Sequence, residues 1–147
     1  MAFEKVIERI RQIKADIIGN READALRIGF DLAALIKLRI QTTGVDSSGK
    51  AFEGYVSPYA KERQKKGYQI GYVDFTRTGR LMANIAPRIE KSNVFTATVI
   101  IDGIGQRSKG IIAGAARKRG NILSASADEI ELARKANISR LEKYLKL

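Results

Sequence analysis

The 147-residue sequence contains no cysteine and no histidine, and these two absences exclude several kinds of site. Without cysteine there can be no disulfide and no thiolate metal ligand, which fits a protein made in a reducing compartment. Without histidine there can be no Ser-His-Asp triad, no histidine-ligated zinc and no imidazole proton shuttle. We therefore expect the protein not to be an enzyme and to bind no cofactor or metal.

Long apolar runs are also absent. No segment approaches the roughly 18 apolar residues that a membrane-spanning helix needs. Residues 1–5 lack the basic start and apolar core of a signal peptide. We therefore expect a soluble protein that makes no membrane contact. Apolar residues make up 44% of the chain, an ordinary share that predicts one compact domain.

Positive charge is in excess over negative charge. The chain has 27 Lys and Arg residues against 16 Asp and Glu residues, which gives a net charge of +11. A balance this basic favours an anionic partner, which can be nucleic acid, an acidic protein surface or anionic lipid. Charge alone does not choose among these partners.

The spacing of apolar residues predicts helices at both ends of the chain. Residues 2–18 and 21–40 repeat apolar side chains at helical spacing. Gly19 between them allows either an antiparallel helical hairpin or a bend in one long helix. Ser126 followed three residues later by Glu129 is a capping-box pattern, which predicts a C-terminal helix of about five turns.

The segment after the N-terminal helices, residues 41–86, is expected to form a loop-rich arm with short helices. It begins with polar, turn-rich stretches that contain isolated aromatic residues. Ser57 is a candidate N-cap and Pro58 suits a first helical position, which predicts a short basic helix over residues 59–66. A further short helix is expected from residue 78.

Two strands are predicted after this arm. Residues 88–90 and 94–101 are the strand candidates, with a turn at residues 91–93 and a boundary at Pro87. One face of the second strand is more apolar than the other and is expected to meet the helices. That face carries Phe95, Ala97, Val99 and Ile101.

These elements predict an α+β fold, with a small antiparallel β-sheet packed against long N-terminal and C-terminal helices. The glycine-containing residues 102–110 are expected to be a flexible connection that leads to a short helix over 111–119. All elements are assigned to a single domain, residues 1–147. Its parts are a helical N-terminal part, the arm, and the hairpin with the C-terminal helix, at residues 1–40, 41–86 and 87–147.

Basic and aromatic residues are the candidate binding residues. Basic side chains interleaved with aromatic rings can hold phosphates and stack bases. The candidates for facing a partner or DNA are Lys61, Arg63, Lys65, Lys66, Arg117, Lys118 and Arg119. The candidates for an interface loop are Phe52, Tyr55, Tyr59, Tyr68 and Tyr72. The alternative interpretation is a solvated helix face with aromatic residues that anchor a loop, and no known nucleic-acid-binding signature decides between the two.

Three segments carry a resemblance to a known family. Residues 46–60 hold a turn, an isolated Phe52 and the sequence YVSPYA, and residues 73–85 read VDFTRTGRLMANI. Residues 119–126 read RGNILSAS and lead into the C-terminal helix. In this order, and with a β-hairpin between them, the segments resemble the phage virion-morphogenesis, or tail-completion, family. The similarity covers most of residues 43–147.

The resemblance implies a structural role in a tailed phage. The expected function is that of a neck or tail-completion subunit, which joins head and tail through ring-like oligomeric assembly. Its expected partners are other neck, portal, adaptor or tail proteins and further copies of itself, and non-specific contact with genomic DNA is allowed. The expected location is the virion, after assembly in the host cytoplasm. The sequence departs from the family pattern at Asn84, where serine is common, and at residues 110–114, which lack a histidine-like position.

A second function remains open beside the first. A free basic accessory or regulatory protein that binds nucleic acid would have the same charge. It would be distinguished by affinity for DNA or RNA that falls steeply with salt.

Overall fold

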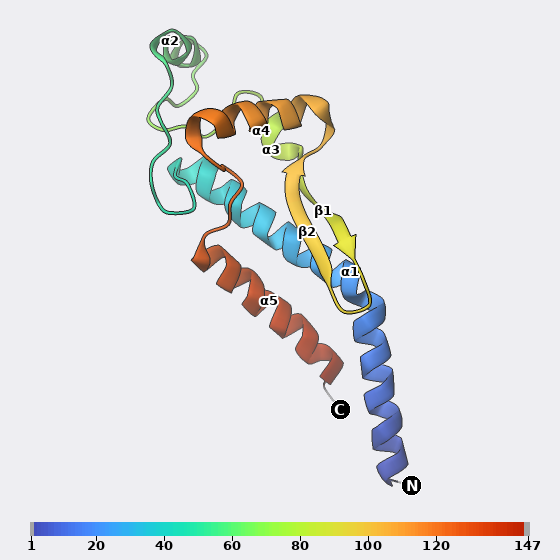
Figure 1. Ribbon diagram of the computed structural model, residues 1–147. Coiled ribbons are helices and arrows are strands. Elements are labelled where there is room, and N and C mark those ends of the chain that lie inside the picture. The colour runs from blue at the N-terminus through green and yellow to red at the C-terminus, as the bar shows by residue number, and fades with distance from the viewer. Residues whose placement is uncertain (1, 146–147) are drawn as a thin grey trace.

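A computed structural model describes residues 2–145 and has an α+β fold (Figure 1). Long helices occupy both ends of the chain and an antiparallel pair of strands lies between them, which confirms the predicted fold class. In chain order the elements are α1 (Ala2–Thr43), α2 (Ser57–Lys65), α3 (Arg80–Ala83), β1 (Ile85–Ser92), β2 (Ala97–Gly103), α4 (Gly105–Arg119) and α5 (Ala127–Leu145).

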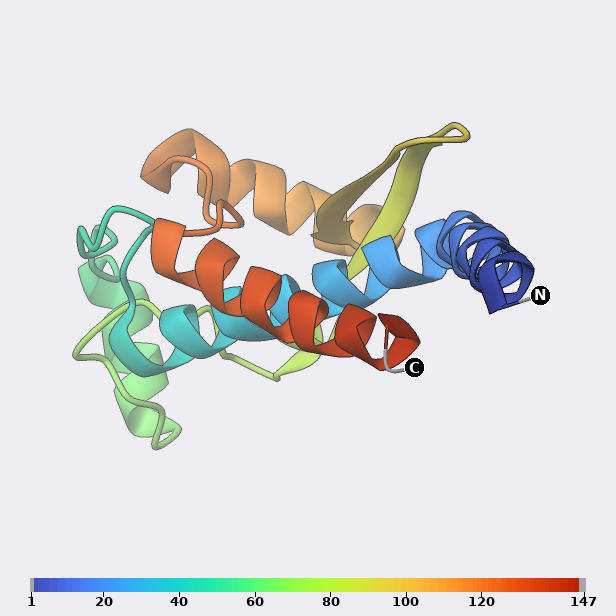
Figure 2. The ribbon, with the colours of Figure 1, turned by 90° about the horizontal axis from the view of Figure 1, so that it is seen from below.

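The N-terminal residues form one continuous helix, α1, and not a helical hairpin. Gly19 and Asn20 lie inside it. The ribbon changes direction between its dark-blue N-terminal part and the rest (Figure 1), and Figure 2 shows the same bend from below. Glycine has a low helix propensity and favours bending, which accounts for a change of direction near Gly19. Of the two alternatives that the sequence left open, the bend is the one observed.

The hairpin turn lies later in the chain than predicted. Asn93 Oδ1 accepts hydrogen bonds from the N–H groups of Phe95 at 2.8 Å and Thr96 at 2.9 Å, which closes the turn. The expectation that Phe95 faces the helices is therefore wrong, since its side chain is 88% exposed at the tip of the hairpin. Pro87 lies inside β1 and not at a boundary. This position tolerates proline because β1 has a neighbour on one side only.

The sheet packs on α1 at Gly29. A Cβ atom at this position would stand 2.6 Å from Pro87 Cβ and 2.7 Å from Val99 Cγ1. The absence of a side chain at Gly29 therefore allows the close approach of helix and sheet. Val99 meets the helix, as the alternation in the second strand predicted.

Helix α5 lies antiparallel to α1. The guanidinium of Arg39 donates to Glu129 at 2.8 Å near the start of α5, and Arg140 pairs with Asp31 further along. The capping box at the start of α5 is confirmed. Ser126 N–H donates to Glu129 Oε2 at 2.7 Å, and Glu129 N–H donates to Ser126 Oγ at 3.2 Å.

The connection after β2 is a helix and not a flexible segment. Only Ile104 separates the end of β2 from the start of α4 at Gly105, so the predicted flexible stretch was wrong over most of its length. A Cβ atom at Gly103 would stand 2.8 Å from Ile112 Cδ1 and 2.9 Å from Lys109 N. The absence of a side chain at Gly103 therefore allows α4 to pack closely on the end of β2. The start of α2 also differs slightly, because Val56 and not Ser57 is the N-cap residue.

The core forms where the second half of α1 meets the arm, α3 and the start of β1. Its most buried members include Ile36, Ile40, Val73, Ile85 and Ile122. Within residues 2–145, no helix is both long enough and apolar enough to span a membrane.

Candidate functional site

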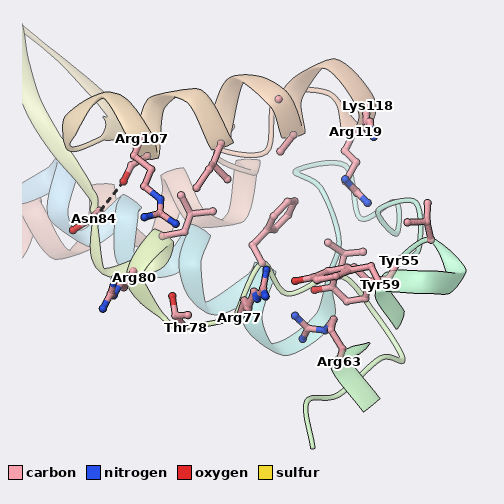
Figure 3. Close-up of a pocket in the computed structure, with 18 of the residues that line it drawn as sticks. Tyr55, Tyr59, Arg63, Arg77, Thr78, Arg80, Asn84, Arg107, Lys118 and Arg119 are labelled. Carbon is pink, nitrogen blue, oxygen red and sulfur yellow. Dashed lines mark hydrogen bonds between the residues drawn. The ribbon is translucent and has the colours of Figure 1, made fainter. Parts of the chain in front are cut away.

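A cleft with a volume of about 1390 Å³ lies between α4, α3 and the arm (Figure 3). Apolar side chains contribute to its wall, among them Phe75, Leu81, Ile104 and Ile111. Small-molecule sites typically occupy roughly 300–1,000 Å³, so this cleft is large enough for a segment of another chain. Its cationic lining residues are Arg63, Arg77, Arg80, Arg107, Lys118 and Arg119.

Several of these cations have no carboxylate partner in the part of the chain that the structure describes. Among residues 2–145, no ion pair involves Arg80, Arg107 or Lys118. Arg77 pairs with Glu62 at 2.9 Å, but both side chains are about half exposed. The cleft therefore offers positive charge to an anionic ligand beside apolar surface. Only one carboxylate residue, Glu53, is among the described residues that line it.

Arg119 occupies the end of the cleft next to the arm. Its guanidinium donates to the carbonyl oxygens of Glu53 at 3.1 Å and Gly54 at 3.5 Å, and Cζ lies 5.8 Å from the ring centroid of Phe75. These contacts connect α4 to the arm. Arg119 therefore holds α4 to the arm and also contributes positive charge to the cleft.

Arg63 borders the cleft, but its guanidinium is buried and bonded inside the arm, which corrects the expectation that it faces a partner. Its side chain is 2% exposed and its guanidinium donates to Asp74 Oδ1 at 3.1 Å, to the Gln69 carbonyl at 3.0 Å and to the Thr76 carbonyl at 3.0 Å. Cζ also lies 4.3 Å from the ring centroid of Tyr55. The arm folds around this guanidinium, so Arg63 holds the arm together.

Asp74 completes this buried cluster. Tyr55 Oη donates to Asp74 Oδ1 at 2.7 Å, and burial together with this bond raises the pKa of Tyr55 to about 12. Burial alone would raise the pKa of Asp74. Hydrogen bonds from Gln69, the Thr76 N–H and Tyr55, and then the charge of Arg63, outweigh burial and leave the pKa of Asp74 below its ordinary value. The carboxylate is thus held in its charged form.

Two of the aromatic residues predicted to form an interface loop are structural. Phe52 is buried in the core, with its ring edge-on to Phe75 at 5.6 Å between centroids, so the prediction for Phe52 is wrong. The ring of Tyr72 packs where a Cβ atom of Gly44 would stand, and Tyr72 Oη donates to the Gln41 carbonyl at 2.9 Å. Tyr72 therefore fastens the arm to the end of α1.

The other predicted aromatic residues lie in or near the cleft. Tyr55 and Tyr59 line it, with ring centroids 5.4 Å apart in an edge-on arrangement. Tyr68 is 37% exposed and its ring centroid lies 5.4 Å from Arg63 Cζ, outside the cleft lining. The structure thus brings two of the five candidates to the site.

The predicted basic residues separate into two groups. Arg63, Lys118 and Arg119 line the cleft, whereas Lys61, Lys65, Lys66 and Arg117 are exposed outside it. Lys66 also pairs with Glu62 at 2.8 Å. A partner-facing role for the outer group stays a prediction. The simpler explanation for Arg117, a cation in the last turn of α4, is that it complements the helix dipole.

Sequence reasoning did not select Arg77, Arg80 and Arg107 as site residues. Arg77 precedes α3, Arg80 begins it, and Arg107 lies in the first turn of α4. Figure 3 shows their side chains around one cavity, together with Tyr59 and Lys118. No spacing in the sequence marks these residues as neighbours, because the β-hairpin separates α3 from α4.

The chemistry of the cleft is that of binding an anion. Within residues 2–145 no three His, Cys, Asp or Glu side chains are grouped so that they could hold a metal ion. Comparison with protein-family models, with curated proteins and with solved structures gave no match.

Proposed function

We propose that this chain is a structural subunit of a tailed-phage particle, acting at the neck or in tail completion, where it joins head and tail through ring-like assembly. The observation that carries the proposal is the cationic cleft with apolar walls. Such a surface suits an acidic, partly apolar segment of a neighbouring subunit. The proposed role involves no catalysis, because assembly requires interfaces between subunits and no chemical turnover.

The segments that resemble the virion-morphogenesis family support this proposal through their place in the fold. Residues 46–60 and 73–85 are the two parts of the arm that the Tyr55–Asp74 hydrogen bond joins. Residues 119–126 follow from the end of α4 to the start of α5. The resembling segments therefore build one wall of the cleft and its support, and are not scattered over the molecule.

Exposed apolar side chains give further support. Phe95 at the hairpin tip, and Ile130 and Leu132 on α5, are each more than half exposed. Apolar side chains exposed on several elements suit a protein that buries them against neighbours. The alternative, a free nucleic-acid-binding protein, draws its support from the exposed lysines of α2, since a cationic helix face attracts phosphates.

The decisive test is the location of the chain in particles. Virions of the phage or prophage that encodes it should be purified by density gradient, dissociated and probed with an antibody against the chain. We expect the chain to co-purify with intact particles in a fixed ratio to the other structural proteins. Recovery only from the free protein of the lysate, together with tight salt-sensitive binding of duplex DNA, would overturn the proposal and favour the regulator.

A further inference from the structure

The first half of α1 carries an apolar stripe that the fold does not use. Phe3, Val6, Ile10 and Ile17 are between 43% and 75% exposed, and Ile13 on the same face is partly exposed. This part of the helix extends away from the rest of the molecule (Figure 1). The stripe therefore consists of aliphatic and aromatic side chains that the described part of the chain leaves largely uncovered.

The stripe is distinct from the face by which α1 joins the core. At 3.6 residues per turn, Gly29, Ala33, Ile36 and Ile40, which are buried in the body, lie roughly a third of a turn away from it. The buried Asp24 continues the line of the stripe, but it is polar. The apolar contact between α1 and the core therefore does not run along the stripe. Some other surface has to meet it.

The spacing of the stripe is that of a coiled coil. Its apolar residues stand at intervals of 3, 4, 3 and 4, which places Phe3, Ile10 and Ile17 at a positions and Val6 and Ile13 at d positions. The outward positions between them are mostly polar, for example Lys5, Glu8, Arg11 and Gln12. Such a pattern predicts pairing with a second helix of the same kind.

We propose that residues 3–20 of α1 pair with the same residues of a second copy, as an antiparallel two-helix coiled coil. The core layers are then Ile10 against the partner's Ile13, and Val6 against the partner's Ile17. Each layer occurs twice, because the pairing is two-fold symmetric. This pairing does not depend on the phage function proposed above.

Charge selects the antiparallel direction. In this arrangement the g positions of the two helices face each other, so Arg9 meets the partner's Asp16, twice. In a parallel pair Arg9 would instead meet the partner's Lys14, a repulsion that also occurs twice. The one favourable parallel pair, Asp16 with Arg21, competes with existing bonds, because Arg21 donates to the Val94 carbonyl at 3.2 Å and to Ser92 Oγ at 3.1 Å.

The antiparallel direction also brings apolar groups together at the ends of the contact. The partner's Phe3 would stand opposite Asn20. The next residue, Arg21, donates to the Val94 carbonyl and so joins the hairpin to α1. The hairpin tip beside it exposes Val94 at 58% and Phe95 at 88%. The phenyl ring of Phe3 can therefore be covered by the hairpin tip of the other copy.

The first experiment is sedimentation velocity of the full chain over a range of concentrations, with charge variants. We expect a reversible dimer of twice 16.3 kDa. Arg9→Asp should weaken it, because the introduced carboxylate would face the partner's Asp16, and Arg9→Asp with Asp16→Arg should restore it. Lys5→Asp, the matched control on the outward face, should leave the dimer unchanged. In a parallel pair Arg9→Asp would strengthen the dimer, so the sign of the effect tests the direction.

Disulfide trapping provides an independent readout, since the chain has no native cysteine. Val6→Cys and Ile17→Cys chains should cross-link when mixed and oxidised, and neither should cross-link alone. Positions 6 and 17 are about 16 Å apart along a helix, beyond the reach of a disulfide. A monomer at all concentrations, or self-cross-linking of either variant alone, would overturn the proposal. Circular dichroism of each variant separates loss of pairing from loss of fold.

Discussion

Arg63 and Asp74 form a buried ion pair, with 3.1 Å between Nη2 and Oδ1 and side chains 2% and 9% exposed. The pair joins α2 to the segment that leads to α3, and this segment forms a wall of the cationic cleft. A residue that sequence reasoning assigned to a partner is therefore the support on which the site depends.

Asp74→Asn should destabilise the protein by about 3 kcal/mol or more, because it leaves the guanidinium of Arg63 buried without a counter-charge. Asparagine keeps the size of the side chain, so the decrease in the free energy of unfolding reflects the lost charge and not a cavity. Urea unfolding followed by circular dichroism gives the free energy of unfolding. Glu62→Gln is the matched control, since it removes a half-exposed carboxylate that pairs with Arg77 and Lys66. A loss of similar size in the control would contradict the special role of the buried pair.

The same carboxylate should make stability depend on pH in acid. The folded-state pKa of Asp74 lies below the ordinary value of 3.8, so the unfolded chain takes up this proton first as the pH falls. The stabilisation is complete above about pH 5 and is lost as the pH falls through the folded-state pKa. Urea unfolding at stepped pH should show a shallower acid decline for Asp74→Asn than for the unaltered chain. Parallel curves would show that Asp74 does not contribute to the decline.

Two glycines of α1 should respond to alanine in opposite directions. Gly29→Ala places a Cβ atom within 2.7 Å of Pro87 and Val99, so helix and sheet must separate. Overpacking of this kind typically costs about 1–3 kcal/mol, and the better helix propensity of alanine offsets roughly 1 kcal/mol of it. Gly19→Ala meets no atom within 4 Å and should stabilise the helix by up to about 1 kcal/mol. Thermal unfolding of both variants tests the packing, and stabilisation by Gly29→Ala would contradict it.

Local patterns predicted the helices and the capping box, because the contacts that decide them lie within a few residues. Ser126 and Glu129 are three residues apart, so the two bonds of the capping box lie within the first turn of α5. The burial of Arg63 was not predictable in this way, since it depends on Asp74, eleven positions later, and on the path of the arm between them. The cleft was even harder to predict from local sequence, because its residues come from separate elements. Arg80 and Lys118 line one cleft only because the hairpin between α3 and α4 brings these two helices to the same side of the molecule.

The charge of the cleft is testable with two triple variants that change the net charge equally. Arg80→Gln, Arg107→Gln and Lys118→Gln remove cations from the cleft, whereas Lys61→Gln, Lys65→Gln and Arg117→Gln remove them from the surface outside it. A synthetic peptide of alternating glutamate and leucine is a suitable probe, because it matches both the positive charge and the apolar wall. Fluorescence anisotropy of the labelled peptide gives its affinity for each variant.

We expect the cleft variant to lose roughly tenfold to a hundredfold in affinity for this peptide, and the outer variant to bind as the unaltered chain does. Both variants have the same net charge and the same long-range attraction for the peptide. A difference in affinity would therefore reflect where the removed cations lie. If the two variants lose affinity equally, the peptide responds to overall charge and the cleft is not its site. Repeating the titration with duplex DNA at several salt concentrations then tests the other function. A salt slope that falls only in the outer variant would place phosphate contacts on the exposed lysines of α2 and favour nucleic-acid binding over assembly.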